Sequence, residues 1–250
     1  MPNGDLLANY GADRLKLLRQ LPDALAAAEG VRLAYLYGSL GRGDADSWSD
    51  IDVVVVLDRA AVEDTIEDRV AFPARLATPC YVLDSPWNAP LAGAQVNALY
   101  VGSSGLPVYV DWNLWPEDMC SVPRDGQVIY IRPGVDVQTI NEDFCAVSTY
   151  ERQRRPEPDE MGEDWVRHAR FGMLPIAAKF FARQQVDRLQ SLLRGIGGSG
   201  DLGTPPAQVA VIRERLQVLG AGQRPDARKA VAALVELAEL RVLGTPGNRD

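Results

Sequence analysis

The stretch YLYGSLGRGDADSWSDIDVVVV, residues 35–56, combines residue types that act together in phosphate chemistry. A short apolar run ends at Gly38 and Ser39, and after ten further residues Asp50 and Asp52 open a second apolar run. Side chains two apart on a strand point to the same face, so the carboxylates of Asp50 and Asp52 project side by side. Aligned carboxylates repel each other unless a cation lies between them, and Mg²⁺ prefers oxygen ligands. The pattern therefore indicates a divalent-metal site.

The residues around this site supply a phosphate-binding half and a third acid. Glycine at a strand end lets the backbone N–H of Gly38 and the hydroxyl of Ser39 approach a phosphate closely. Arg42, in the loop that follows, can clamp a triphosphate, although loop arginines are often simply solvated. Asp111 in PVYVDWNL is an acid on a largely apolar strand, and that placement is costly unless the carboxylate is used. We therefore take Asp111 as the third carboxylate.

The combination of Gly-Ser, ten residues, Asp-x-Asp and a later strand aspartate resembles the polymerase-beta-like nucleotidyltransferase superfamily. The size, with a helical C-terminal part, is similar to the antibiotic nucleotidyltransferases that adenylylate aminoglycosides or lincosamides. The close resemblance covers residues 35–56 and 108–114. It implies ATP or another NTP, two Mg²⁺ ions, and transfer of a nucleoside monophosphate to a hydroxyl with release of pyrophosphate. By position it makes Asp50, Asp52 and Asp111 catalytic metal ligands and Gly38 and Ser39 phosphate contacts.

Other polar and aromatic residues have a structural and a functional interpretation. Lys179 and Arg183 share a helix face and could reach the nucleotide phosphates, or they could form a solvated basic face. The single histidine, His168, is interpreted as a partly buried helical residue. Three tryptophans are interpreted as packing residues, with stacking on a base or substrate as the alternative: Trp112, Trp115 and Trp165. The candidates for a general base are Asp84 and an acidic group after the linker: Asp159, Glu160, Glu163 and Asp164.

The front half must form the sheet that positions these residues. Hydrophobic periodicity predicts one or two helices over residues 5–29, interrupted near Gly11 and Pro22, and a helix over residues 60–76. Short apolar runs predict strands at 31–37, 51–57, 80–83 and 128–131, with a hairpin formed by 97–101 and 107–114. The segment between residues 38 and 50 is expected to be a loop, with room for one short helix.

The back half has helical periodicity after a charged, proline-containing linker, RQRRPEPDEMGE. Helices are expected over residues 159–185 with a kink at Pro175, and over 186–196, 206–219 and 225–243. The predicted fold is α+β: an N-terminal mixed sheet with flanking helices, followed by a C-terminal helical bundle. We place the nucleotidyltransferase catalytic domain in residues 1–140 and the helical domain in residues 141–250.

Composition narrows the class of protein. With 250 residues, 46% hydrophobic and 24% charged, the chain has the composition of a soluble globular protein, and no apolar stretch is long enough to span a membrane. Three cysteines at wide spacings predict no disulfide framework or zinc site, but a cytoplasmic protein with three buried or inert thiols. Residues 1–149 hold 10 basic and 21 acidic residues, a formal charge of −11. Such a surface repels nucleic acid and suits metal ions and cationic small molecules.

Together with these observations, the resemblance implies a magnesium-dependent adenylyltransferase acting on a small hydroxylated acceptor, such as an aminoglycoside or lincosamide antibiotic. The expected partners are the NTP and this acceptor, with no nucleic acid and no membrane, and the protein is expected to be a monomer or homodimer. One alternative is a nucleotidyltransferase that modifies a protein or RNA hydroxyl, including antitoxin-type relatives. Another is a non-catalytic nucleotide-binding module, although three retained aspartates argue against it.

Overall fold

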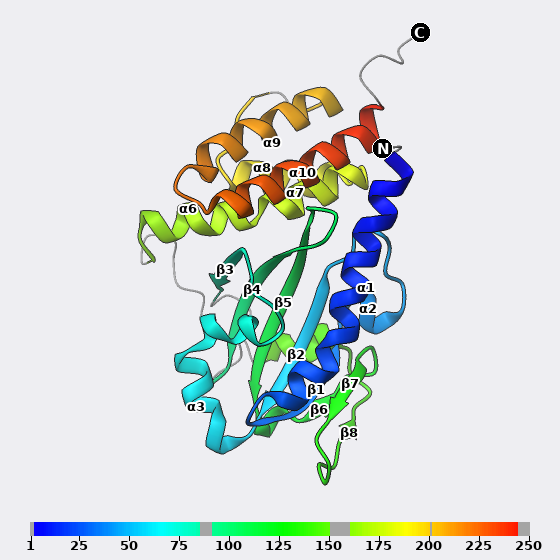
Figure 1. Ribbon diagram of the computed structural model, residues 1–250, viewed down its shortest axis with the longest axis vertical. Helices are drawn as coiled ribbons and strands as arrows, with labels where there is room; N and C mark the ends of the chain where they lie inside the picture. Colours follow the sequence, from blue (N-terminus) through cyan, green and yellow to red (C-terminus); the bar gives the residue numbers. More distant parts are fainter. Residues whose placement is uncertain (1–2, 86–91, 151–160, 201, 245–250) are drawn as a thin grey trace. The chain divides into compact units, whose positions relative to one another are not determined.

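The computed structural model describes residues 3–85, 92–150, 161–200 and 202–244 of the chain (Figure 1). Contacts divide the chain into two units. The sheet unit comprises residues 12–100 and 108–157, and the helical unit comprises residues 1–11, 101–107 and 158–250. In the described part of the chain, no helix is both long and apolar enough to cross a membrane.

A six-stranded mixed sheet forms the centre of the sheet unit, as predicted. Its strand order is β3-β4-β5-β2-β1-β7. In chain order, the strands are β1 Val31–Leu36, β2 Ile51–Leu57, β3 Tyr81–Asp84, β4 Ala94–Val101, β5 Pro107–Pro116 and β7 Gln127–Ile131. The pairs β1–β2, β1–β7 and β3–β4 are antiparallel, whereas β2 and β5 are parallel. Two short strands that the sequence did not predict, β6 Ser121–Val122 and β8 Gln138–Thr139, pair separately.

Both faces of the central strands are covered. Residues 53–57 of β2 are fully buried, which confirms the prediction from its run of β-branched residues. On one face lies the part of α1 (Asn3–Ala27) that belongs to the sheet unit, residues 12–27 (Figure 1). On the other, α4 (Phe144–Tyr150) adds Phe144 and Val147 to a core cluster that contains Tyr35, Val54 and Trp115. The polar site described below lies on this second face, because Asp52 alternates with Val53 and shares its side with Val54.

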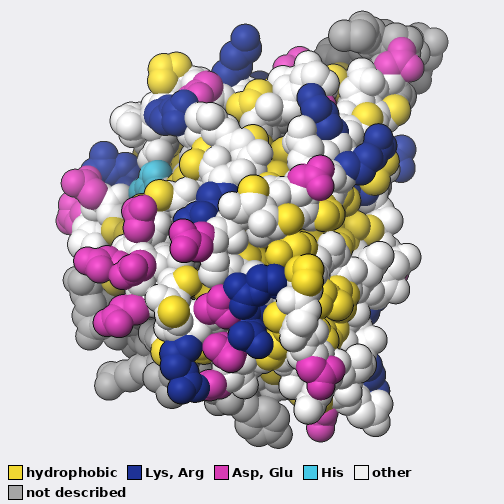
Figure 2. All heavy atoms as spheres, turned by 60° about the horizontal axis from the view of Figure 1, so that its bottom comes forward, with side chains coloured by type: hydrophobic (Ala, Val, Ile, Leu, Met, Phe, Trp, Pro, Cys, Tyr) yellow, Lys and Arg dark blue, Asp and Glu magenta, His cyan; other side chains and the backbone are white. Residues whose placement is uncertain are grey.

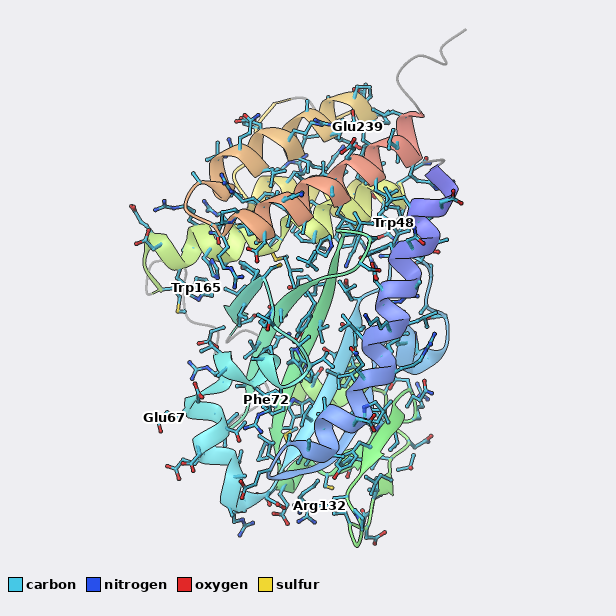
Figure 3. All side chains as sticks on the ribbon, viewed as in Figure 1. Trp48, Glu67, Phe72, Arg132, Trp165 and Glu239 are labelled. Atoms are coloured by element: carbon cyan, nitrogen blue, oxygen red, sulfur yellow. The ribbon has the colours of Figure 1, made fainter. Side chains whose placement is uncertain are left out.

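Two predicted helices differ from the observed ones. α1 runs without a break through Gly11 and Pro22, because its apolar stripe, including Leu21 and Leu25, is buried and this burial offsets the hydrogen bond lost at the proline. The predicted helix over residues 60–76 is divided into α3 (Arg59–Glu67) and the 3₁₀ segment η1 (Arg69–Arg75). Pro73 in η1 has no N–H to donate in an α-helix, which accounts for the end of the α-helical turns, and Phe72, labelled in Figure 3, packs edge-on against Trp112 with a centroid distance of 5.5 Å.

A charge network lies at the end of the sheet where β1 starts and β2 ends. Asp58 accepts two hydrogen bonds of 2.6 Å from Arg132 and one of 3.0 Å from Arg32. The hydrogen bonds from Arg132 lower the pKa of Asp58, and Arg32 adds to this effect. Arg132 is labelled in Figure 3, and Figure 2 shows basic and acidic side chains next to one another on the face turned toward the viewer. The network has the composition of a structural ion-pair cluster.

The helical unit contains the predicted C-terminal helices. They are α6 Glu163–Gly172, α7 Leu174–Ala182, α8 Val186–Gly195, α9 Pro205–Gly220 and α10 Pro225–Leu243. The expected kink at Pro175 is a break, since α6 ends before it and Pro175 lies in the first turn of α7, where a missing N–H costs nothing. His168 is partly buried, as predicted, and its Nδ1 lies 3.0 Å from the Gln223 side chain. Most of the predicted linker, residues 152–160, lies outside the described residues.

Candidate active site

Two acidic side chains face each other across the parallel pair β2 and β5. In the register of this pair, Asp52 lies directly opposite Asp111. Parallel strands in register turn equivalent residues to the same face, so the two carboxylates project side by side. The backbone N–H of Tyr37 donates to the carbonyl oxygen of Asp52 at 3.0 Å, which holds the end of β1 beside them. The sequence-predicted pairing of Asp111 with the Asp-x-Asp motif therefore has a structural basis at Asp52.

Gly38 lies against the Asp52 carboxylate. Its φ is +64°, in the left-handed region that glycine tolerates. A Cβ at this position would lie 2.4 Å from Oδ2 of Asp52, which is closer than any side chain allows. The glycine after β1 is thus required both by backbone conformation and by the close approach of Asp52. Gly38 begins α2 (Gly38–Arg42), the short helix for which the predicted loop left room.

The Asp111 carboxylate accepts hydrogen bonds from residues that sequence reasoning missed. Nε2 of Gln95 lies 2.7 Å from Oδ1 and 2.8 Å from Oδ2 of Asp111, and Nδ2 of Asn97 lies 3.0 Å from Oδ1. The hydroxyl of Tyr37 approaches Oδ2 at 3.4 Å and accepts a hydrogen bond of 2.7 Å from Asn113. Gln95 and Asn97 are polar residues two apart in the apolar strand β4, the same signal that identified Asp111 on β5.

Burial and mutual repulsion act on both acids. Burial and, to a smaller extent, the negative charge of Asp111 raise the pKa of Asp52, Arg42 lowers it, and the net value is about 7. Burial also raises the pKa of Asp111 to about 6, against the hydrogen bonds from Gln95, Tyr37 and Asn97, which lower it. Above these pKa values two negative charges share one buried site, and a cation between them would remove the repulsion. The electrostatics of the pair therefore favour a bound cation.

A cavity of about 290 Å³ opens beside the pair. The sheet and α2 contribute Tyr37, Gly38, Arg42, Asp52, Gln95, Asp111 and Asn113 to its lining, and a second wall is formed by Asp125, Phe144, Cys145 and Ser148. Three aspartates and one arginine make the lining acidic. Cys80 is buried, Cys120 is half-buried and Cys145 is exposed, so burial holds for Cys80, and the inertness of the other two thiols stays a prediction.

The second wall is built on α4, which the predicted domain boundary assigned to the helical domain and which belongs to the sheet unit. The ring of Phe144 stacks on Tyr37 at a centroid distance of 3.7 Å and on Trp115 at 5.6 Å. The backbone N–H of Phe144 donates to Oδ1 of Asp125 at 2.7 Å. Trp115 and Trp112 are core residues, as predicted. Tyr37 contacts both Phe144 and Asp111, so it connects the α4 wall with the carboxylate pair.

The structure brings together only part of the predicted site. Gly38, Arg42, Asp52 and Asp111 line the cavity, and the guanidinium of Arg42 also pairs with Asp44 at the surface. Ser39 in α2 and Asp50 before β2 are not among the lining residues. Lys179 is a buried residue of α7 in the helical unit. The roles of Ser39, Asp50 and Lys179 stay predictions.

Two of the candidates for a general base form ion pairs in the structure. Asp84 accepts hydrogen bonds of 2.8 and 2.6 Å from Arg69, so this carboxylate belongs to an ion pair. Asp164 pairs with Arg167 on the first turns of α6. Asp159 and Glu160 lie outside the described residues.

The carboxylate pair fits one divalent cation. Within the described residues, no group of three or more Asp, Glu, His or Cys side chains is placed to hold a metal ion. Mg²⁺ characteristically takes one or two protein carboxylates and completes its shell with water and substrate phosphates. Asp52 and Asp111 place two carboxylates beside the cavity, and this number of carboxylates fits such a shell. The predicted triad with Asp50 and the second ion stay predictions.

Comparison with known proteins identifies part of the chain. Residues 18–81 match the family model described as nucleotidyltransferase domain, a segment that includes Gly38 and Asp52 and ends before β4 and β5. A search of curated protein sequences finds no match. Solved structures with a loose likeness include an aminoglycoside 6-adenyltransferase from Bacillus subtilis, with 11% identity, a TM-score of 0.31, and coverage of 91% of this chain and 98% of that chain.

A second such structure is the STING-associated CdnE c-di-GMP synthase from Capnocytophaga granulosa. It has 12% identity and a TM-score of 0.34, with coverage of 94% of this chain and 81% of that chain. At these TM-scores, neither likeness carries information about the substrate of the present protein.

Proposed function

The chain carries a nucleotidyltransferase domain, and from this premise we propose that it transfers a nucleoside monophosphate, AMP from ATP, to a hydroxyl group of a small molecule. The observation that carries the proposal is the opposition of Asp52 and Asp111 on parallel strands beside Gly38. A pair of buried carboxylates with raised pKa values is costly to maintain in a protein that does not bind a cation there. Its position next to a strand-end glycine suits a metal-bound triphosphate.

In the proposed reaction the acceptor oxygen attacks the α-phosphorus of ATP. The bond between the α-phosphorus and the bridging oxygen breaks, pyrophosphate leaves, and the hydroxyl proton passes to solvent or to a base. Bound Mg²⁺ supplies charge neutralisation and lowers the pKa of the attacking hydroxyl. Asp52 and Asp111 hold the ion, with Asp50 as the predicted third ligand. Catalysis then consists of positioning and electrostatic stabilisation.

The triphosphate is assigned to the end of β1. In this proposal the backbone of Gly38 and the hydroxyl of Ser39 contact the phosphates, and the guanidinium of Arg42, which lines the cavity, offsets their charge. The nucleotide preference for ATP and the second Mg²⁺ ion belong to the same proposal.

The acceptor is proposed to be a hydroxylated and cationic compound, such as an aminoglycoside, with a lincosamide as the less charged alternative. The support is charge: Asp125 adds a third acid to the cavity lining, and residues 1–149 carry 10 basic against 21 acidic residues. An acidic surface attracts a polycation over a range set by ionic strength. In this proposal the protein confers antibiotic resistance in the cytoplasm, as a monomer or homodimer.

A pyrophosphate-release screen tests the proposal. ATP, GTP, CTP and UTP are each combined with Mg²⁺ and with aminoglycosides, lincosamides or buffer, and Asp52→Asn serves as the matched inactive control. We expect release with ATP and one acceptor class, and none from the variant. If none of the acceptors gives pyrophosphate release but the protein binds a nucleotide in equilibrium dialysis, the result would instead support a non-catalytic module or a macromolecular acceptor.

A further inference from the structure

Two amide side chains of β4 donate hydrogen bonds to Asp111, one of the two proposed metal ligands. Gln95 and Asn97 are 2% and 7% exposed in a strand whose other described residues are mostly apolar and buried. Burying an amide without hydrogen-bond partners is unfavourable, so such residues are retained where their polar groups are used. In both residues the amide nitrogen donates to Asp111. An ionised carboxylate only accepts hydrogen bonds, so the NH₂ group of each amide, and not its carbonyl oxygen, must face Asp111.

The two oxygens of Asp111 are not equally occupied. An ionised carboxylate accepts about two hydrogen bonds at each oxygen. Oδ1 accepts hydrogen bonds of 2.7 Å from Gln95 and 3.0 Å from Asn97, and these two bonds use its acceptor capacity. Oδ2 receives Gln95 at 2.8 Å, and its second neighbour, the hydroxyl of Tyr37, is 3.4 Å away, longer than an ordinary O–H···O hydrogen bond. Oδ2 therefore keeps acceptor capacity, whereas Oδ1 does not.

We propose that Gln95 and Asn97 are positioning residues that lock the Asp111 carboxylate in one orientation and present Oδ2 as its single metal-ligand atom. This inference rests on the proposed function, because it concerns how the same pair holds a divalent cation. The carboxyl group of an aspartate turns easily about its last torsion, so its orientation depends on the groups that hydrogen-bond to it. Two donated hydrogen bonds from a rigid strand hold the group in place before the cation arrives.

The variant Gln95→Met tests this role because it keeps the length of the side chain and removes the donor to both oxygens. Mn²⁺, which takes the same oxygen ligands as Mg²⁺, is titrated into the full chain with a non-hydrolysable ATP analogue, and free Mn²⁺ is measured by electron paramagnetic resonance. Loss of a residue that orients a metal ligand typically weakens metal affinity about 10- to 100-fold. We expect a loss in this range for Gln95→Met.

The control is Gln208→Met in the helical unit. Gln208 is also buried, and its Nε2 donates to the carbonyl oxygen of Leu202 at 2.8 Å, so both substitutions remove one buried amide. A purely structural role for Gln95 predicts that both variants lower the unfolding temperature and that neither changes Mn²⁺ affinity. If Gln95→Met does not fold, Asn97→Leu removes only the bond to Oδ1 and should weaken Mn²⁺ binding several-fold.

The outcomes separate the two proposals. Mn²⁺ binding to the wild-type chain with unchanged affinity in Gln95→Met, or in Asn97→Leu where that variant is used, would overturn the positioning role and leave the proposed function intact. Absence of Mn²⁺ binding to the wild-type chain would overturn the proposed metal site itself, and the positioning role with it. Weaker binding in the β4 variants alone, with the Gln208 variant equal to wild type, is the expected result.

Discussion

Replacing Asp52 by asparagine should stabilise the metal-free protein while abolishing nucleotidyl transfer. Burial and the neighbouring charge of Asp111 raise the pKa of Asp52 from 3.8 to about 7. At about 1.4 kcal/mol for each pKa unit, charging this group in the folded state costs at most about 4 kcal/mol relative to the unfolded chain. Asparagine has nearly the same shape and carries no charge, so the variant avoids this cost. Its loss of a metal ligand should lower activity about a thousandfold or more.

The stability difference between Asp52→Asn and the wild-type chain should depend on pH. Because the folded-state pKa of Asp52 is raised, the contribution of Asp52 to stability is fully present below about pH 4 and is lost as pH rises to about 7 and above. Asp52→Asn lacks this titration. The two proteins should therefore unfold at similar urea concentrations at pH 4.5, whereas at pH 8 the variant should need more urea by an amount that corresponds to at most about 4 kcal/mol.

Urea unfolding in EDTA at pH 4.5, 6 and 8 is the assay. Asp58→Asn is the matched control, because Arg132 and Arg32 lower the pKa of Asp58 and the sign is reversed. That variant should be less stable than wild type at pH 8, and the difference should shrink as pH falls through the folded-state pKa. Adding Mg²⁺ with an ATP analogue should stabilise only proteins that retain Asp52. A variant Asp52→Asn that is less stable than wild type at pH 8 would refute the electrostatic reasoning.

Three further predictions concern the same site. Gly38→Ala should lower transfer activity at least about a hundredfold and lower the unfolding temperature, since a Cβ would lie 2.4 Å from the Asp52 carboxylate; a steady-state assay showing wild-type turnover would contradict the close approach. Asp111→Asn should need much more Mg²⁺ for the activity that remains, and an unchanged Mg²⁺ titration would exclude Asp111 as a ligand. For a polycationic acceptor, raising ionic strength should raise the acceptor KM several-fold with little change in kcat, whereas a KM that falls with salt would leave the acidic charge without a role in binding.

Much of the fold could be predicted because its signals are local. The apolar runs of β1 and β2, the hairpin of β4 and β5, and the helical periodicity after residue 160 depend on residues close in sequence, and the structure contains all of them. Local signals failed where packing competed with them. Pro22 predicts a helix break, yet α1 continues because its buried leucines hold it together.

In the candidate site, too, the residues with a local sequence signal could be predicted and the contacts between distant segments could not. Gly38 and Asp52 are separated by 14 positions around one loop, so their spacing could be interpreted from the sequence, and alternation on β5 was enough to single out Asp111. That Asp111 lies opposite Asp52 follows from the parallel register of β2 and β5, two strands far apart in the chain. Alternation was equally visible at Gln95 and Asn97, but neutral amides in a strand have many structural uses, and nothing local indicates which acid they contact.

By itself, then, the sequence determined most of the strands and helices and singled out Gly38, Asp52 and Asp111 as candidates, because backbone propensity and alternation act over a few residues. Only the tertiary structure decided which polar groups meet. It placed Asp84 in an ion pair with Arg69, and it brought Phe144 of α4 against Tyr37 to form the second wall of the cavity beside Asp52 and Asp111. The physical reason is that a hydrogen bond or a charge pair depends on distances of a few ångströms between segments distant in the chain, and the pairing of strands and the packing of helices against the sheet set those distances.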